Sequence, residues 1–492
     1  MAANIRPTCH DSLQKKIDAA RPGSTVRLAG NCIYRETVVV NKPLTLDGGG
    51  KGEIRGSDVW RRWRREGSVW VSRDSVPRFP VDHRYRCEGS SRECRWPEQV
   101  FINGRPLEQV ASNPGPGQFA LDAGRHVILA NDPAGHAVEV TVRKSWIVGA
   151  SPGVTVKGIT MKDAAGDGLW NGGYSDWTVE NDDLSWAHAR DLSLTLGDGL
   201  VARDNELHDG GQLGLGSNDA SVKIVGNRVY RNNVEGFDPR WEAGGMKVTQ
   251  PRHAVISGND VYDNRDIGIW TDVVNPAQKN VEISHNRVHG NPRNGIRVEI
   301  TKNFSVRDNV VWENGWGEGN SYNGAGISIN GSRDGVVKDN VLAWNASGIG
   351  VVQQERRRSH EQAYNTVRDV RLQANKIIQS EPPGSSDHAA IFWNGSGSAI
   401  RGVPSLYNPA MNNGGVGDAF WFEGSRESAC RFKWQGRCRS LTGFNATPAE
   451  KGGRYLSTAE KEALLRQNGL PASPSRHPQK PWGILSRLSR LF

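Results

Sequence analysis

Two acidic residues stand at equivalent positions in two similar segments of the sequence. Asp272 lies in the segment GIWTDV, which begins at Gly268, and Glu299 lies in the segment GIRVEI, which begins at Gly295. A pair of carboxylates held about 5 Å apart can act as the nucleophile and the general acid and base at a glycosidic bond. The chemistry therefore depends on whether the fold brings these two segments together.

Residues suited to binding a sugar lie around this pair. Lys247, Trp270 and Arg297 occupy one shared position in three successive segments, and Asn330 follows at the position of the two acids. Tryptophan rings can stack on sugar faces in water, whereas Lys and Arg bind hydroxyl groups or charges. Longer stretches between the segments bring further residues to the rim of a site, and the candidates for substrate binding among them are Trp241, Glu242 and Trp316.

These segments belong to an internal repeat, in which an Asn stands between two apolar positions and the period is roughly 22–34 residues. The recurring residues are Asn205, Asn227, Asn259, Asn286, Asn309, Asn340 and Asn375. One unit of this kind cannot bury its apolar face alone, so we expect the units to stack coil on coil as a parallel β-helix. The Asn side chains would then superimpose and hydrogen-bond along the stack, in a structural role.

The stacking predicts which side chains meet. Side chains along a strand point alternately to opposite faces, and neighbouring strands lie ~4.8 Å apart. When the coils are aligned on their glycines, Ile269 and Ile296 point into the core. Asp272 and Glu299 become neighbours in one outward column, with Lys247, Trp270 and Arg297 in the column beside them.

The composition fits such a narrow core. The chain has 492 residues, of which 58 are Gly and 36% are hydrophobic, and its mean hydropathy is −0.59. These values do not suit a wide helical core, and the 17 Trp spread along the chain argue against disorder. No run of about 18 apolar residues is present, so we expect no transmembrane segment.

The expected fold class is all-β, with a right-handed parallel β-helix at its centre and four regions along the chain. They are an N-terminal cap with the first coils (1–57), an inserted β subdomain (58–145), the β-helix with its Asn ladder (146–400), and a C-terminal disulfide hairpin, helix and basic tail (401–492). Asp11 can N-cap a short helix in the cap. Ser457 and Glu460 form a capping-box pattern that predicts the C-terminal helix.

Six cysteines occur as three pairs that are close in sequence. The pairs are Cys9 with Cys32, Cys87 with Cys94, and Cys430 with Cys438. None has the CxxC spacing of zinc or thioredoxin-like sites, so the pairs predict three local disulfides and an oxidising compartment. No signal peptide precedes Met1 in this sequence. We therefore expect the mature chain of an exported protein, which would be secreted, periplasmic or at the cell surface.

The net charge of +9 raises the question of an anionic partner. Basic residues alternate with acidic ones and form no Lys/Arg tract, which argues against nucleic acid. A polyanionic saccharide, or simple surface solubility, accounts for the charge equally well. We expect a monomer whose partner is an oligosaccharide or polysaccharide substrate.

The Asn-ladder coils, the N-terminal cap and the GIWTD and GIRVEI segments resemble bacterial right-handed parallel β-helix repeat proteins of the pectate-lyase-like superfamily. A strand with Trp-x-Asp, followed one coil later by Val-Glu, is similar to the retaining β-helix glycosidases such as the β-xylosidases. The resemblance implies that Asp272 is the nucleophile and Glu299 the acid/base. Thr271 replaces an apolar residue of that family, and Ile300, Thr301 and Lys302 replace its His-Gly-Pro run.

Three functions follow as hypotheses. The first is a secreted glycoside hydrolase that needs no cofactor. The second is a polysaccharide lyase or uronate epimerase, in which Lys247 or Arg297 is the base and Asp272, Glu299 or Glu242 holds a Ca²⁺ ion that neutralises the uronate. The third is a non-catalytic surface protein that binds glycans through the same groove.

Overall fold

Short strands joined by tight turns make up most of the chain, because apolar and polar residues alternate over short runs. The computed structural model describes residues 6–80, 86–89, 92–317, 322–354, 366–380, 388–395, 404–424 and 430–475. The α-helices in this part of the chain are α1 (Leu13–Ala19), α2 (Leu441–Asn445) and α3 (Thr458–Gln467). None of them combines the length and the hydropathy that crossing a lipid bilayer requires. The predicted basic tail, 483–492, lies outside the described residues.

The chain divides into two compact units. The first holds the described residues up to Gly216 together with Asn232–Ala243, and the second holds Ser217–Arg231 and the described residues from Gly244 onward. Both are built mainly from parallel strands that pair one coil apart. The predicted all-β parallel β-helix is therefore confirmed.

In the first unit, parallel strands form three ladders. The first two share the long strands β4 (Leu44–Arg55) and β15 (Val154–Ala164). The first ladder also contains β1 (Thr25–Arg27), β17 (Trp177–Glu180) and β20 (Leu200–Arg203). The second also contains β2 (Ile33–Tyr34), β18 (Asp183–Ala187) and β21 (Glu206–His208). The third contains β3 (Val38–Val40), β14 (Ile147–Gly149), β16 (Leu169–Trp170), β19 (Arg190–Thr195) and β22 (Leu213–Asn218). Because β4 pairs directly with β15, residues on either side of the insertion lie in adjacent coils.

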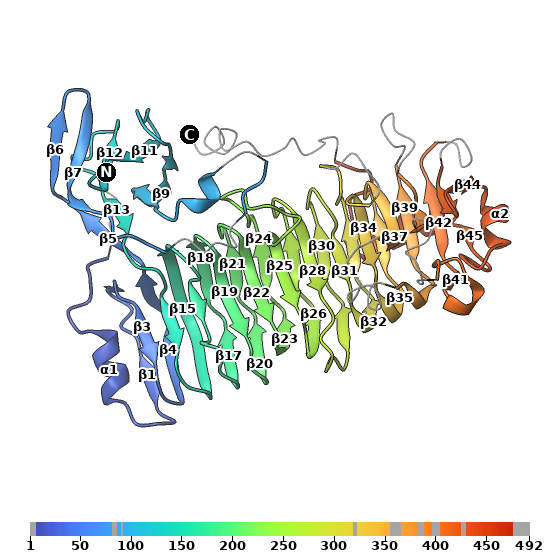
Figure 1. Cartoon of the computed structure of the whole chain (residues 1–492), viewed down its shortest axis with the longest axis horizontal. Helices are drawn as coiled ribbons and strands as arrows, with labels where there is room; N and C mark the ends of the chain where they lie inside the picture. The colour runs from blue at the N-terminus through green and yellow to red at the C-terminus, as the bar shows by residue number, and fades with distance from the viewer. Residues whose placement is uncertain are drawn as a thin grey trace. The chain divides into compact units, whose positions relative to one another are not determined.

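The second unit has the same organisation, and Figure 1 shows its strands following one another side by side. One ladder contains β23 (Ser221–Val225), β26 (His253–Ser257), β29 (Val281–Ser284), β32 (Lys302–Arg307), β35 (Arg333–Lys338), β38 (Arg368–Gln373) and β41 (Gly414–Val416). The next contains β24 (Arg228–Tyr230), β27 (Asp260–Tyr262), β30 (Arg287–His289), β33 (Val310–Trp312), β36 (Val341–Ala343), β39 (Lys376–Gln379), β42 (Ala419–Phe422) and β45 (Arg454–Tyr455). The third contains β25 (Gly244–Thr249), β28 (Ile267–Asp272), β31 (Ile296–Glu299), β34 (Ala325–Asn330), β37 (Ser347–Gln353), β40 (Ile391–Gly395), β43 (Phe432–Trp434) and the antiparallel β44 (Arg437–Arg439).

The region predicted as an insertion, 58–145, holds two sheets that are mainly antiparallel. One consists of β5 (Ser57–Trp60), β13 (Val138–Thr141), β8 (Val100–Ile102) and β9 (Arg105–Pro106), and the other of β6 (Trp63–Glu66), β7 (Val69–Ser75), β12 (His126–Leu129), β11 (Gln118–Leu121) and β10 (Glu108–Gln109). The predicted tight turn joins β8 to β9, where Asn103 and Gly104 both have positive φ angles. Such a turn matches the twist of the two strands that it connects.

The predicted Asn ladder runs through the second unit. From Asn227 onward, each side chain donates to the Oδ1 of the Asn one coil further on, at 2.9–3.0 Å. Each Asn also satisfies main-chain groups at the turn; Asn286, for example, donates to the carbonyl of Ile256 at 2.9 Å. These bonds leave the turns of neighbouring coils in a common register.

A second ladder runs beside the first and was not predicted. It consists of Asn264, Asn291, Asn314 and Asn345, which are linked in the same way at 2.9–3.1 Å. In the sequence these residues follow the next short strand after each Asn of the first ladder, where Asn is common in any turn.

The chain ends differ from expectation in two respects. Ser12, rather than Asp11, is the N-cap of α1 and accepts from the backbone N–H of Lys15. The parallel coils also continue past residue 400, as far as β45. This continuation was missed because Asp418 takes the place of the ladder Asn and accepts from the Asn375 side chain at 3.0 Å.

All three predicted disulfides are present. They join Cys9 to Cys32, Cys87 to Cys94, and Cys430 to Cys438. No free cysteine occurs in the described residues. The first bridge ties the segment before α1 to the first coil, as expected, because Cys32 directly precedes β2. The capping box of Ser457 and Glu460 is also confirmed, and it begins α3.

A buried carboxyl pair closes the first Asn ladder. Asp418 and Glu450 are fully buried, and the backbone N–H of Asp418 donates to Glu450 Oε1 at 3.3 Å. Burial, together with the side chain and the charge of Asp418, raises the pKa of Glu450 to about 9. The folded protein therefore keeps a proton that the unfolded chain releases at a much lower pH.

We predict that Asn286→Ala lowers the free energy of unfolding by about 2–4 kcal/mol. The substitution removes the buried partner of Asn259, Asn309 and the Ile256 carbonyl, and unmade buried hydrogen bonds carry the full desolvation cost. Urea unfolding followed by circular dichroism measures the change. The exposed Asn280→Ala is the control and should change the value by less than about 1 kcal/mol; equal effects would contradict a structural ladder.

We also predict that Glu450→Gln changes how stability depends on pH. Because the folded pKa is raised, its contribution is complete below the unfolded pKa and is lost as the pH rises towards 9. The wild-type protein should lose about 2–4 kcal/mol between pH 5 and pH 9 from this pair, and the variant should lose much less. Thermal unfolding at both pH values, with the exposed Glu462→Gln as control, tests this. Parallel pH curves for Glu450→Gln and the wild type would refute it.

Candidate active site

The candidate site is built on three neighbouring strands of the second unit, β25, β28 and β31. Their register pairs Lys247 with Trp270 and Trp270 with Arg297, as the alignment of the coils predicted. Thr249 pairs with Asp272 in the adjacent column, and Glu299 pairs with Asn330 of β34. Asp272 and Glu299 each come one position after the last residues that pair β28 with β31, Thr271 and Val298.

Each of the two acids has its own cation. Lys247 Nζ lies 2.9 Å from Asp272 Oδ2, and Arg297 Nε lies 3.0 Å from Glu299 Oε2. Asp272 is the more accessible acid, since 14% of its side chain is exposed, against 3% for Glu299. Ion pairs that are this well buried are screened little by salt, so the site holds two carboxylates in fixed positions.

Trp270 lies between the two cations and hydrogen-bonds to one of the two acids. Lys247 Nζ lies 3.5 Å from the centre of its ring, and the Arg297 guanidinium carbon lies 5.1 Å from it. The indole Nε1 donates to Glu299 Oε2 at 3.1 Å. Because Lys247 and Arg297 come from the strands on either side and the ring is only 3% exposed, its faces are not open to a sugar here. Its contacts are those of a residue that orients Glu299, which differs from the stacking role predicted from the sequence.

Tyr322 joins the site from the segment before β34 and was missed in the sequence. Its hydroxyl accepts from Arg297 Nη2 at 2.6 Å, lies 2.9 Å from the Asn330 amide, and also contacts Gln354. The predicted binding residue Asn330 therefore lies in the site, and its side-chain oxygen is oriented to accept from Arg297. The sequence predicts a site residue in the long segment before β34, but at Trp316 rather than at Tyr322.

The protonation of Arg297 is settled by its neighbours. Burial lowers the pKa of Arg297, but the charges of Glu299 and Asp272 and the Tyr322 hydroxyl outweigh burial and raise it above its ordinary value. The guanidinium therefore stays charged at any physiological pH and cannot accept a proton.

The three residues predicted at the rim of the site contact residues that are not part of it. Trp241 and Glu242 belong to the first unit, where Trp241 lies against Arg86 at 4.1 Å and Glu242 pairs with Arg190 at 2.7 Å. Trp316 is half-buried in the second unit and donates to the Trp344 carbonyl at 2.8 Å. In the described part of the chain, no three His, Cys, Asp or Glu side chains are grouped as metal ligands would be.

Comparisons with known proteins agree with the architecture. Residues 167–322 match the family model described as "Right handed beta helix region". Among solved structures, the complex of XylC with xylose is 16% identical over 86% of this chain and 82% of that one, with a TM-score of 0.54. The mannuronan C-5 epimerase AlgE4 A-module of Azotobacter vinelandii is 14% identical over 85% and 94%, with a TM-score of 0.49. No curated protein sequence matches this chain. The fold is that of a right-handed parallel β-helix.

We predict that Lys247→Met destabilises the protein by about 2–4 kcal/mol at pH 7. The change leaves Asp272 without its cation beside Glu299, and breaking one side of a buried ion pair is costly. The loss should shrink in the double variant that combines Lys247→Met with Asp272→Asn, because that variant no longer buries an unpaired charge. Chemical unfolding measures this, with the exposed Lys223→Met as control. A loss that is the same in the single and the double variant would refute the ion pair.

Proposed function

We propose that this protein is a carbohydrate-active enzyme, and specifically a glycoside hydrolase that cleaves an oligosaccharide or polysaccharide with retention of configuration. The observation that carries the proposal is the pair Asp272 and Glu299, which end neighbouring strands and are each held by a cation. Strands in a sheet lie ~4.8 Å apart. That spacing suits the roughly 5–5.5 Å separation of a retaining pair, whereas inverting pairs need room for a water molecule.

Asp272 is proposed as the nucleophile. It is the more accessible of the two acids, and Lys247 Nζ, 2.9 Å from Asp272 Oδ2, orients the carboxyl group that must attack the anomeric carbon. Displacement by Asp272 would form a covalent glycosyl–enzyme ester, while the leaving oxygen takes a proton from the second acid.

Glu299 is proposed as that acid and, afterwards, as the base. Once the ester forms, Glu299 would deprotonate the attacking water, and the donors from Arg297 and Trp270 hold its carboxyl group in position for both proton transfers. The same two residues could thus support both halves of the reaction, with Lys247, Arg297, Asn330 and Tyr322 available to bind sugar hydroxyls.

The contacts of the two cations favour hydrolysis over β-elimination or epimerisation. A lyase or epimerase needs a base that removes the proton α to a uronate carboxyl group. Arg297 stays protonated, and Lys247 makes the contacts of an ammonium ion, with Asp272 on one side and the Trp270 ring on the other. Neither is placed as a free base.

We further propose that the enzyme works outside the cytoplasm, since its three disulfides are typical of oxidising compartments.

We predict that Asp272→Asn and Glu299→Gln each lower hydrolysis by at least about 10³-fold on natural glycans. The two should differ on aryl glycosides with good leaving groups, which need no acid: Glu299→Gln should recover much of its activity there, and added azide should yield a glycosyl azide. Mass spectrometry of a glycan panel, with the partly exposed Asp308→Asn as control, provides the readout.

Each alternative outcome has a distinct meaning. If Asp272→Asn rather than Glu299→Gln recovered activity on aryl glycosides, Glu299 would be the nucleophile and Asp272 the acid and base. Products about 18 mass units lighter than those of hydrolysis, or activity abolished by a chelator, would show that the reaction is a calcium-dependent elimination. Binding without any product in the wild type would make the protein a glycan-binding surface protein, and undiminished hydrolysis by both variants would overturn the site.

A further inference from the structure

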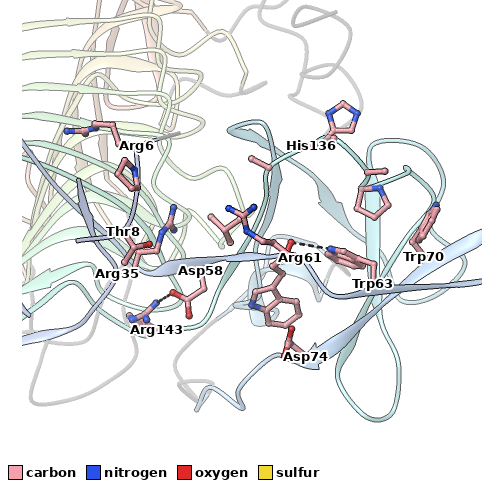
Figure 2. A pocket seen from close by; sticks show the side chains of 17 residues that line it. Arg6, Thr8, Arg35, Asp58, Arg61, Trp63, Trp70, Asp74, His136 and Arg143 are labelled. Atoms are coloured by element: carbon pink, nitrogen blue, oxygen red, sulfur yellow. Dashed lines mark hydrogen bonds and ion pairs between the residues drawn. The ribbon is translucent and has the colours of Figure 1, made fainter. Parts of the chain in front are cut away.

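A cavity lies in the first unit, between the N-terminal segment and the inserted sheets. Its volume is about 1120 Å³, which exceeds the range of ordinary small-molecule pockets and has room for several sugar rings. Figure 2 shows Arg61 between Trp63, Trp70 and His136 on one side and Arg6, Thr8 and Arg35 on the other. Every residue that lines it belongs to the first unit, whereas the candidate active site belongs to the second.

The aromatic side of the cavity is carried by the hairpin of β6 and β7. Trp63 pairs with Ser72, and Trp70 pairs with Arg65, so the two indoles project from the same face of the hairpin. Both rings are half-buried, and Trp63 Nε1 donates to the Trp60 carbonyl at 3.2 Å. Two fixed, partly open indoles on one face offer successive platforms for sugar rings.

The charged side of the cavity leaves one guanidinium available. Three of the four arginines that line it are neutralised by a carboxylate. The pairs are Arg6 with Glu53, Arg35 with Glu139 and Arg143 with Asp58. The remaining lining acid, Asp74, pairs with Arg62. Arg61 is exposed, between β5 and β6, and has no hydrogen-bond or ion-pair partner among the described residues.

We propose that this cavity binds an acidic oligosaccharide, with its sugar rings on Trp63 and Trp70 and a uronate carboxylate on Arg61. A planar guanidinium recognises a carboxylate through two parallel hydrogen bonds, and no lining acid opposes it because each is already paired. A nucleic acid fits less well, since it needs several phosphate contacts and the cavity offers one free cation among the described residues. The cavity would hold a charged glycan chain independently of catalysis.

The test uses the full chain with Asp272→Asn, so that no substrate turns over during binding. Isothermal titration calorimetry with tetragalacturonate should show binding, and xylotetraose of the same length should bind at least about tenfold more weakly. Arg61→Gln should reduce affinity for tetragalacturonate about tenfold and leave xylotetraose unchanged, whereas Arg61→Lys should recover part of the loss. Arg61 is exposed, so these variants should keep the thermal midpoint of the parent.

A matched control is Arg27→Gln, which removes an exposed arginine of β1 outside the cavity and should leave both affinities unchanged. Equal loss in the Arg27 and Arg61 variants would reduce the effect to net charge and overturn the proposal. Equal affinity for the two glycans, tighter binding of a thymidine octanucleotide, or no binding of tetragalacturonate would also overturn it. Because the Arg61 and Arg27 variants are compared in one background, the difference between them reports on this cavity separately from the role of Asp272.

Discussion

The pairing of each strand with the equivalent strand one coil further on is the constraint on which the rest of this protein depends. It makes residues at the same phase of the repeat neighbours in space, however many residues separate them along the chain. Apolar residues at the same phase are therefore buried together, and Asn side chains bond to Asn side chains at the turns. The same strand register also aligns the acids and cations of the candidate site, so the core and the site both result from it.

The candidate site shows how such a surface can hold charge away from water. Lys247, Asp272, Arg297 and Glu299 carry opposite charges in pairs, so the group is neutral as a whole. Burying any one of them alone would be costly. The indole of Trp270 bridges the pairs by lying against both cations and donating to Glu299. The result is a rigid arrangement, which is what a two-carboxylate mechanism requires.

Much of this could be predicted from the sequence, because a strand has a side-chain period of two and each coil carries a glycine that marks its phase. The columns and the ladder of Asn227 to Asn375 follow from that pattern, and the three disulfides follow from the close spacing of the cysteines. Other features had no comparable signal. The last coils could not be predicted because Asp418 stands where the repeat has an Asn. The second ladder could not be predicted because Asn264 and its equivalents resemble ordinary turn residues.

The sequence alone determined which residues share a column, since periodicity acts locally and repeats without reference to the rest of the chain. Only the tertiary structure decided what covers each column. Trp270 has the pattern of an exposed aromatic residue but is enclosed by long side chains from the neighbouring coils, and Tyr322 reaches Arg297 from a segment with no repeat. Burial and loop contacts depend on side-chain lengths and on segments outside the periodic pattern, and both are resolved only when the coils are stacked.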